Sequence, residues 1–280
     1  MTKYIGSHFT ALHGLDKVFS EAKKIGANSI SFFLKNPRKW FSKSLDNNII
    51  QNFKKNMKKY SFTNNQILPH ASYLINLCNP DITKRTLSKK SFLEEVIMCE
   101  KLGIKYINVH PGNYLVKDNV KLCFKLASSV INEILYETEN VCIVLENTSG
   151  NGTSIGCSFE DLYEIINCIK QSSRIGICID TCHLFSYGYN ISNLENVKNI
   201  FFKFNKIIGF NYLKGMHIND SIGDLGSKVD RHANLGFGKI GTDIFSFIIK
   251  NKIFDNIPLI LETKIQSLRK DEIIWLKSFI

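Results

Sequence analysis

Potential metal ligands recur along this chain at the ends of short apolar runs, and their spacing constrains the fold more than any other feature. The six positions are His70, His110, Glu146, Asp180, His217 and Glu262, separated in that order by 40, 36, 34, 37 and 45 residues. The runs are rich in Ile and Val, as is typical of buried parallel strands, and each gap has room for one crossover helix. A ligand at the carboxyl end of strand after strand predicts a (β/α)8 TIM barrel with a metal site at the C-terminal face of the strands.

Each of these positions also has an ordinary interpretation when it is taken alone. A single Asp or Glu at a strand end is usually a turn former or a helix N-cap. A single His in an apolar context is usually a core group with a hydrogen-bond partner. Six such residues at the same place in successive βα units favour a shared site instead.

The pattern predicts one α/β domain over residues 1–280, because no linker or repeat divides the chain. The expected strands are 4–7, 29–34, 66–70, 106–110, 141–146, 175–180, 214–217 and 258–262. The expected helices are 16–24, 47–60, 87–102, 119–136, 159–170, 194–207, 242–250 and 270–279. Segment 219–241 is long and rich in glycine, and a loop of that size inside a compact barrel is usually functional.

Composition and cysteine usage favour a cytoplasmic protein. Hydrophobic residues make up 44% of the chain, and no apolar run approaches the ~20 residues that a membrane span needs. The first residues do not resemble a signal peptide, and the 8 cysteines lack the spacing of a metal knuckle. We therefore expect no membrane partner and no secretion.

The charge balance favours a polyanionic partner. The 36 Lys and Arg exceed the 25 Asp and Glu and give a net charge of +11. Such an excess indicates affinity for nucleic acid, without sequence specificity. A genome rich in A and T would also enrich the chain in Lys, Asn and Ile, so charge alone does not decide the partner.

Two further motifs enlarge the set of potential ligands. Asp230 and His232 lie two residues apart, so in extended backbone their side chains point the same way. His183 follows Asp180 by three residues. The nine candidate metal ligands are then His70, His110, Glu146, Asp180, His183, His217, Asp230, His232 and Glu262. Because one zinc takes three or four such ligands, three ions are the natural count, with Zn2+ favoured by the imidazoles and Mn2+ as the alternative.

Short motifs distributed over the whole chain carry a resemblance to a known family. They are Lys35-Asn36-Pro37-Arg38, Leu68-Pro69-His70-Ala71-Ser72-Tyr73-Leu74, His110-Pro111-Gly112, Glu146-Asn147-Thr148, Ile179-Asp180-Thr181-Cys182-His183, Met216-His217-Ile218-Asn219-Asp220, Val229-Asp230-Arg231-His232 and Leu261-Glu262-Thr263. In this order and with these spacings the chain resembles endonuclease IV, the class II apurinic/apyrimidinic endonuclease family of base-excision repair. All nine candidate ligands fall on metal-ligand positions of that family.

The resemblance implies a metal centre and a reaction. One zinc would be held by His70, His110 and Glu146, a second by Glu146 as a bridge with Asp180, His217 and Glu262, and a third by His183, Asp230 and His232. Glu146 and Glu262 would belong to the catalytic centre. The implied reaction is metal-assisted hydrolysis of the phosphodiester bond 5′ to an abasic site in double-stranded DNA. It would leave a 3′-hydroxyl and a 5′-deoxyribose phosphate, and the family also removes 3′ blocking groups.

The resemblance also implies how the DNA is held. Family members bend the duplex and flip out the abasic sugar, and their inserting residues correspond here to Arg38, Tyr73 and Leu74. Without the family, Tyr73 and Leu74 would be expected in the core. A monomer associated with the nucleoid is implied as well.

The chain departs from the family pattern at a few places. His13 stands where a glycine is common, and Phe237 replaces a usual glutamate. Lys264 and Ile265 diverge just after Glu262. None of these positions is a candidate ligand, so the catalytic expectation stands.

Two other functions account for part of the pattern. A single-metal sugar isomerase or epimerase of the same barrel superfamily would use Glu146, Asp180, His217 and Glu262. It would leave His183, Asp230 and His232 without a role. A non-catalytic DNA-binding protein would explain the positive charge but would have no use for nine ligands.

Overall fold

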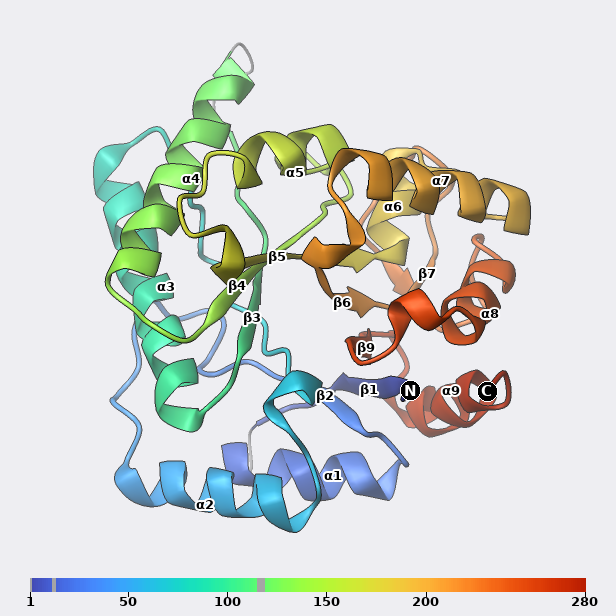
Figure 1. Ribbon diagram of the computed structural model, residues 1–280, viewed down its shortest axis with the longest axis horizontal. Helices are drawn as coiled ribbons and strands as arrows, with labels where there is room; N and C mark the ends of the chain where they lie inside the picture. The colour runs from blue at the N-terminus through green and yellow to red at the C-terminus, as the bar shows by residue number, and fades with distance from the viewer. Residues whose placement is uncertain (1, 12–13, 115–118) are drawn as a thin grey trace.

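Parallel strands form the centre of the molecule, and helices surround them in the ring of a TIM barrel (Figure 1). The computed structural model describes residues 2–11, 14–114 and 119–280. His13, one of the departures from the family pattern, lies outside the described residues. The arrangement agrees with the predicted (β/α)8 fold class.

Seven parallel strands make one sheet in the order β2-β1-β9-β6-β5-β4-β3. They are β1 (Tyr4–His8), β2 (Ser29–Ser31), β3 (Tyr106–Val109), β4 (Cys142–Glu146), β5 (Ile175–Asp180), β6 (Leu213–His217) and β9 (Pro258–Leu261). Each coincides with a predicted strand, and β5 matches the predicted 175–180. Because all seven run in parallel, their carboxyl ends meet at one face of the barrel.

The eighth predicted strand, 66–70, closes the barrel without becoming a regular strand. It makes only isolated bridges, to Ile30 in β2, to Phe33 just after β2 and to Asn108 in β3. His70 N donates to Phe32 O at 3.0 Å, and Asn108 N donates to Pro69 O at 2.8 Å. The prediction of a continuous strand here is wrong, because Pro69 has no N–H to give to the ladder with β3.

The helices follow the predicted order with different boundaries. They are α1 (Val18–Lys24), α2 (Asn47–Lys59), α3 (Ile82–Leu102), α4 (Val120–Tyr136), α5 (Phe159–Ile166), α6 (Thr181–Tyr187), α7 (Leu194–Ile207), α8 (Asp243–Lys250) and α9 (Arg269–Lys277). Helix α3 begins five residues before its predicted start because the Asp81 carboxylate caps it, accepting from Thr83 N at 2.8 Å. Helix α5 ends earlier than predicted, since the chain continues in tighter turns such as Cys168 N to Ile165 O at 3.2 Å.

One helix and one pair of short strands were not predicted. Helix α6 starts directly after β5, with the Asp180 side chain as its N-cap accepting from His183 N at 2.8 Å. The 219–241 segment, predicted as a loop, contains the antiparallel pair β7 (Asp220–Ser221) and β8 (His232–Ala233). This pair turns the end of the long loop back toward the barrel.

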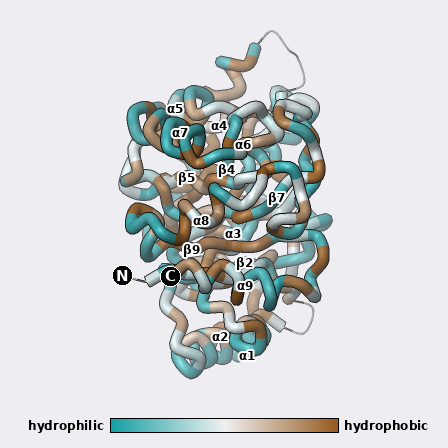
Figure 2. The backbone as a smooth tube through the Cα atoms, turned by 90° about the vertical axis from the view of Figure 1, so that its right-hand side faces the viewer, coloured by the Kyte–Doolittle hydropathy of each residue, from teal (hydrophilic) through white to brown (hydrophobic). Residues whose placement is uncertain are grey.

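The core lies between the strands and the inner faces of the helices. Apolar residues are concentrated in the central strands, and hydrophilic residues recur over the outer helices (Figure 2). Fully buried Phe side chains, among them Phe19, Phe53 and Phe92, fill the layer between helices and sheet. No helix in the described part of the chain is both long enough and apolar enough to cross a membrane.

Candidate metal centre

The nine candidate ligands gather at the face where the parallel strands end. Glu146, Asp180 and His217 are the last residues of β4, β5 and β6, and His110 and Glu262 directly follow β3 and β9. His70 lies in the bridging segment beside Asn108, His183 lies in the first turn of α6, and β8 and the residues before it supply His232 and Asp230. The structure therefore brings together residues that are up to 192 positions apart, His70 and Glu262 being the extremes.

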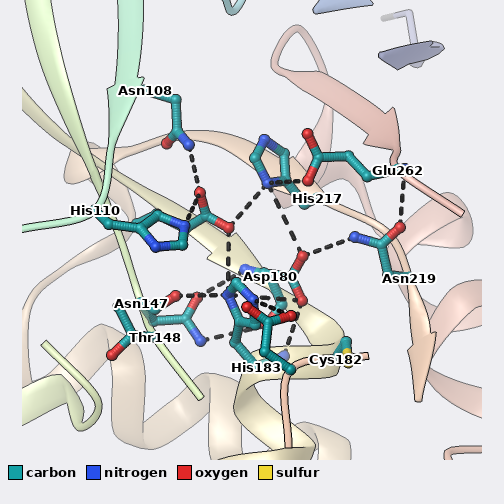
Figure 3. A network of polar contacts seen from close by, with 12 residues as sticks. Asn108, His110, Asn147, Thr148, Asp180, Cys182, His183, His217, Asn219 and Glu262 are labelled. Atoms are coloured by element: carbon teal, nitrogen blue, oxygen red, sulfur yellow. Dashed lines mark hydrogen bonds and ion pairs between the residues drawn. The ribbon is translucent and has the colours of Figure 1, made fainter. Parts of the chain in front are cut away.

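Glu146 lies at the centre of the cluster, and its two carboxylate oxygens face different partners. Figure 3 shows the neighbouring His217 with its contacts to Glu262 and Asp180. Glu146 Oε2 lies 3.3 Å from His70 Nε2 and 3.2 Å from His110 Nε2. Oε1 lies 2.9 Å from His217 Nδ1 and 3.3 Å from His183 Nδ1. A carboxylate placed in this way can serve two adjacent ions, one through each oxygen.

Two further groups flank this carboxylate. His217 Nδ1 lies 3.3 Å from Glu262 Oε2 and 3.9 Å from Asp180 Oδ2. On the other side, Asp230 Oδ1 lies 3.2 Å from His183 Nε2 and 3.4 Å from His232 Nε2. The ligand atoms of His70, His110 and Glu146, of Asp180, His217 and Glu262, and of His183, Asp230 and His232 each lie within 4.8 Å of one another.

These distances between ligand atoms fit the coordination of divalent metal ions. Two ligands at about 2.0–2.1 Å from one tetrahedral zinc are separated by about 3.4 Å, close to the pair distances in each group. The Nε2 atoms of His183, His217 and His232 are buried and have no hydrogen-bond partner of acceptable geometry among the described residues. A buried imidazole nitrogen without a partner is costly unless a ligand satisfies it. The donor set of imidazoles and carboxylates is one that zinc accepts.

The electrostatics keep Glu146 and Asp230 ionised and able to bind cations. Burial of Glu146 opposes its ionisation, but His217 and His110 beside it hold the pKa of the carboxyl well below its usual range. Burial likewise opposes ionisation of Asp230, but the imidazoles of His183 and His232 beside its carboxylate lower its pKa strongly. The imidazoles of the cluster therefore offset the negative charge of its carboxylates. Bound cations would offset that charge in their place.

Three residues that sequence reasoning did not assign to the site hold its ligands. Asn108 donates from its side-chain amide to Glu146 Oε2. Asn219 donates to Asp180 Oδ2 at 2.7 Å and accepts from the backbone N–H of Glu262 at 2.9 Å. His8 Nδ1 lies 3.0 Å from Glu262 Oε1. The signal was present for the two asparagines, because each lies two positions from a ligand, the spacing that shares a face in extended chain.

A cleft of about 740 Å³ opens over the cluster. Its lining includes seven candidate ligands together with Tyr73 and Arg269. Of the predicted DNA-contacting residues, Tyr73 is 67% exposed and packs on Phe33 with ring centroids 4.9 Å apart. Arg38 is exposed and Leu74 is partly exposed, so none of the three is the core residue that hydrophobicity alone would predict.

Two of the departures from the family pattern, Phe237 and Ile265, lie outside the ligand groups. Phe237 is 79% exposed in the turn after Asn234, whose carbonyl accepts from Phe237 N at 2.9 Å. Ile265 is 51% exposed, and its backbone N–H bonds to the Asn234 side chain at 2.9 Å. Neither residue is part of a ligand group.

Fold and site together define a xylose isomerase-like TIM barrel with a cluster of candidate metal ligands at the carboxyl ends of its strands. The family model described as "Xylose isomerase-like TIM barrel" matches residues 19–279. A relative named "Probable endonuclease 4" from Buchnera aphidicola is 49% identical over 275 residues, which are 98% of each chain. "Apurinic-apyrimidinic endonuclease 1" from Plasmodium falciparum is 47% identical over 260 residues, which are 93% of this chain and 44% of the relative.

Solved structures show the same fold. Endonuclease IV from Thermus thermophilus superposes with a TM-score of 0.86 at 24% identity, over 99% of this chain and 98% of the other. A D-tagatose 3-epimerase-like protein superposes with a TM-score of 0.73 at 19% identity, over 98% and 96% of the two chains. With near full-length identity of 49% to "Probable endonuclease 4", this chain belongs to the endonuclease IV family. Metal dependence is typical of that family, and the ligand groups described above agree with it.

Proposed function

We propose that this protein is a metal-dependent DNA-repair endonuclease that hydrolyses the phosphodiester bond 5′ to abasic sites in double-stranded DNA. The products would carry a 3′-hydroxyl and a 5′-deoxyribose phosphate, and the same site would remove 3′ blocking groups. The observation that carries the proposal is the position of Glu146, whose two oxygens face two ligand groups while a third group lies alongside. The names of the sequence relatives, an endonuclease 4 and an apurinic-apyrimidinic endonuclease, support the same activity.

The proposed centre holds three ions, Zn2+ being favoured and Mn2+ the alternative at part of the site. Such ions supply an activated water nucleophile and neutralise charge on the reacting phosphate and the leaving oxygen. His70, His110 and Glu146 would hold the first ion. Asp180, His217 and Glu262 would share Glu146 with the second, and His183, Asp230 and His232 would hold the third.

The protein's own residues would hold this chemistry in place. Glu146 and Glu262 are the proposed catalytic carboxylates, since both line the cleft and contact His217. Asn219 would keep Asp180 and Glu262 at a constant separation through its two hydrogen bonds. The cleft of about 740 Å³ is large enough for a sugar–phosphate unit turned out of a duplex, with the surrounding loops excluding bulk water.

Arg38, Tyr73 and Leu74 would insert into the DNA and fill the gap that the displaced abasic nucleotide leaves. All three are at least partly exposed, and they lie on loops beside the cleft or next to residues that line it. An aromatic ring and an apolar wedge can replace lost stacking, and a guanidinium can stack or bind phosphate. The net charge of +11 would add sequence-independent attraction to the DNA backbone.

A sugar epimerase is the main competing function, because such enzymes share this fold. A single-metal epimerase would need only Glu146, Asp180, His217 and Glu262. It would leave the close group of His183, Asp230 and His232 without a role, although its two buried Nε2 atoms lack a hydrogen-bond partner of acceptable geometry within the described part of the chain. We therefore favour the nuclease. We further propose that residues 1–280 act as one domain, as a monomer, on nucleoid DNA.

The test is incision of a duplex that carries one reduced abasic site, with the products resolved on a denaturing gel. Reduction blocks lyase chemistry, so a cut 5′ to the lesion with a 3′ end that a polymerase extends supports hydrolysis. Metal analysis of the same preparation should find about three zinc ions per chain. An uncut duplex with metal-loaded protein would refute the proposal, and turnover of ketose sugars would then favour the epimerase.

A further inference from the structure

A buried ion pair lies behind the cleft, between the loop that carries Arg38 and the loop that carries Tyr73. Lys35 Nζ lies 3.2 Å from Glu95 Oε1, and both side chains are only 1% exposed. Lys35 begins the Arg38 loop, here defined as residues 35–42, which follows β2. Glu95 lies in the middle of α3. Neither residue is a candidate metal ligand.

The pair is bonded to both loops. On one side, Lys35 Nζ donates to Trp40 O at 2.6 Å and to Ser91 Oγ at 3.0 Å, and Ser91 Oγ donates to Trp40 O at 2.6 Å. On the other side, the Glu95 carboxylate accepts the backbone N–H of Ser72 at 3.0 Å. Ser72 directly precedes Tyr73 in the Tyr73 loop, here defined as residues 71–79.

A direct bond between the loops completes the connection. Ser72 Oγ donates to Pro37 O at 2.6 Å, so the residue before Tyr73 contacts the residue before Arg38. Helix α3 thus supports both loops through Glu95 and Ser91, and the two loops support each other through Ser72. The insertion residues themselves remain exposed at the tips.

We propose that the Lys35–Glu95 pair is a positioning element for DNA insertion, which holds the Arg38 and Tyr73 loops at the spacing required by a bent duplex. This inference rests on the proposed function and deepens it. Loops held in the binding geometry before DNA arrives lose less conformational entropy on binding. The pair therefore acts on the affinity for abasic duplex rather than on the metal centre.

Two variants remove the pair to different degrees. Lys35→Met with Glu95→Met replaces both charges by apolar side chains of similar length, a change that buried ion pairs often tolerate without loss of folding. Glu95→Gln keeps the shape and the acceptor for Ser72 N but removes the charge. The matched control is Lys89→Met, also on α3, which removes ion pairs of 2.7 Å to Glu133 on α4 and of 2.9 Å to Glu137 directly after α4.

The measurements are KM and kcat on the reduced abasic duplex, metal content, and hydrogen exchange of the loop amides. For the double variant we expect KM to rise about tenfold, kcat at saturation to change less than about threefold, and zinc content to remain unchanged. Exchange of the Ser72 amide should accelerate, because its acceptor is gone. Glu95→Gln should raise KM about threefold, since a neutral acceptor bonds more weakly to the Ser72 amide. The control Lys89→Met should match the wild type in all of these measurements.

A folded double variant with wild-type KM and exchange would overturn the inference, as would a loss of kcat together with zinc. If the double variant does not fold, unchanged KM and exchange in Glu95→Gln would overturn it equally. An inactive wild-type protein would instead refute the proposed function. The exchange data would still report whether the pair holds the two loops.

Discussion

The Asn219 side chain donates a hydrogen bond of 2.7 Å to the Asp180 carboxylate, from a position two residues beyond His217. The other end of the same amide accepts the backbone N–H of Glu262 at 2.9 Å. One neutral side chain thus orients two candidate ligands that are 82 residues apart in sequence, 180 to 262. Groups that orient ligands in this way tune metal affinity nearly as much as the ligands themselves.

Replacing Asn219 by Ala should weaken the second metal position. Asp180 would lose a hydrogen bond and Glu262 its backbone anchor, so we expect zinc affinity and incision rate to fall about 10- to 100-fold. Competition with a fluorescent chelator measures the affinity, and the gel assay measures the rate. Asn199→Ala on the exposed face of α7 is the control. Unchanged zinc binding in a folded Asn219→Ala protein would contradict the role assigned to this amide.

Glu146→Gln should abolish incision while preserving the fold. The amide has nearly the volume of the carboxylate but only one good acceptor and no charge, so it cannot bridge two cations. We expect the rate to fall at least about a hundredfold, with loss of one or more zinc ions per chain. Circular dichroism checks the fold, and elemental analysis counts the metal. Wild-type activity in this variant would exclude a bridging carboxylate.

Tyr73→Ala combined with Leu74→Ala should weaken binding to abasic duplex without affecting the metal. Base–aromatic stacking contributes about 1–3 kcal/mol per contact, so Kd should rise about tenfold or more in a fluorescence-anisotropy titration. Tyr136→Ala is the control, because Tyr136 is 87% exposed on α4, away from the cleft lining. Zinc loss in the double variant would show that the loop is structural instead.

Glu95 should make folding stability depend on pH between about 4.5 and 7. Burial raises the pKa of its carboxyl to about 7 despite the neighbouring Lys35. The folded state therefore holds this proton more tightly than the unfolded chain. The protonated Glu95 carboxyl therefore adds to the free energy of unfolding. This contribution is fully present below about pH 4.5 and is lost as the pH rises through about 7.

The matched measurement compares wild type with Glu95→Gln by urea unfolding at several pH values in the presence of chelator. Relative to the variant, the wild-type free energy of unfolding should fall by on the order of 2–3 kcal/mol between pH 4.5 and 7.5. The other titrating groups are common to both proteins, so their contributions cancel in the difference between the two free energies of unfolding. A difference that is flat with pH would mean that the pKa of Glu95 is ordinary.

The strands that carry candidate ligands were predictable from the sequence. A parallel strand that is buried on both faces is apolar at nearly every position, so it shows as a continuous apolar run. Ile175–Asp180 is such a run, and its predicted bounds agree with β5. Segment 66–70 also carries an apolar stretch before a candidate ligand, yet it forms only bridges, since Pro69 interrupts the ladder with β3. Helix α6 escaped prediction because its cap, Asp180, was interpreted only as a strand-end ligand.

The sequence by itself determined the barrel class, the family, and the nine candidate ligands, because each depends on residue type and spacing along the chain. Only the tertiary structure decided which oxygen of Glu146 faces which imidazoles, and that Asn219 and His8 hold Asp180 and Glu262. It also decided that Lys35 and Glu95 meet 60 residues apart, 35 to 95, behind two loops. Such contacts depend on how strands and helices are placed in space, and local periodicity carries no information about that placement.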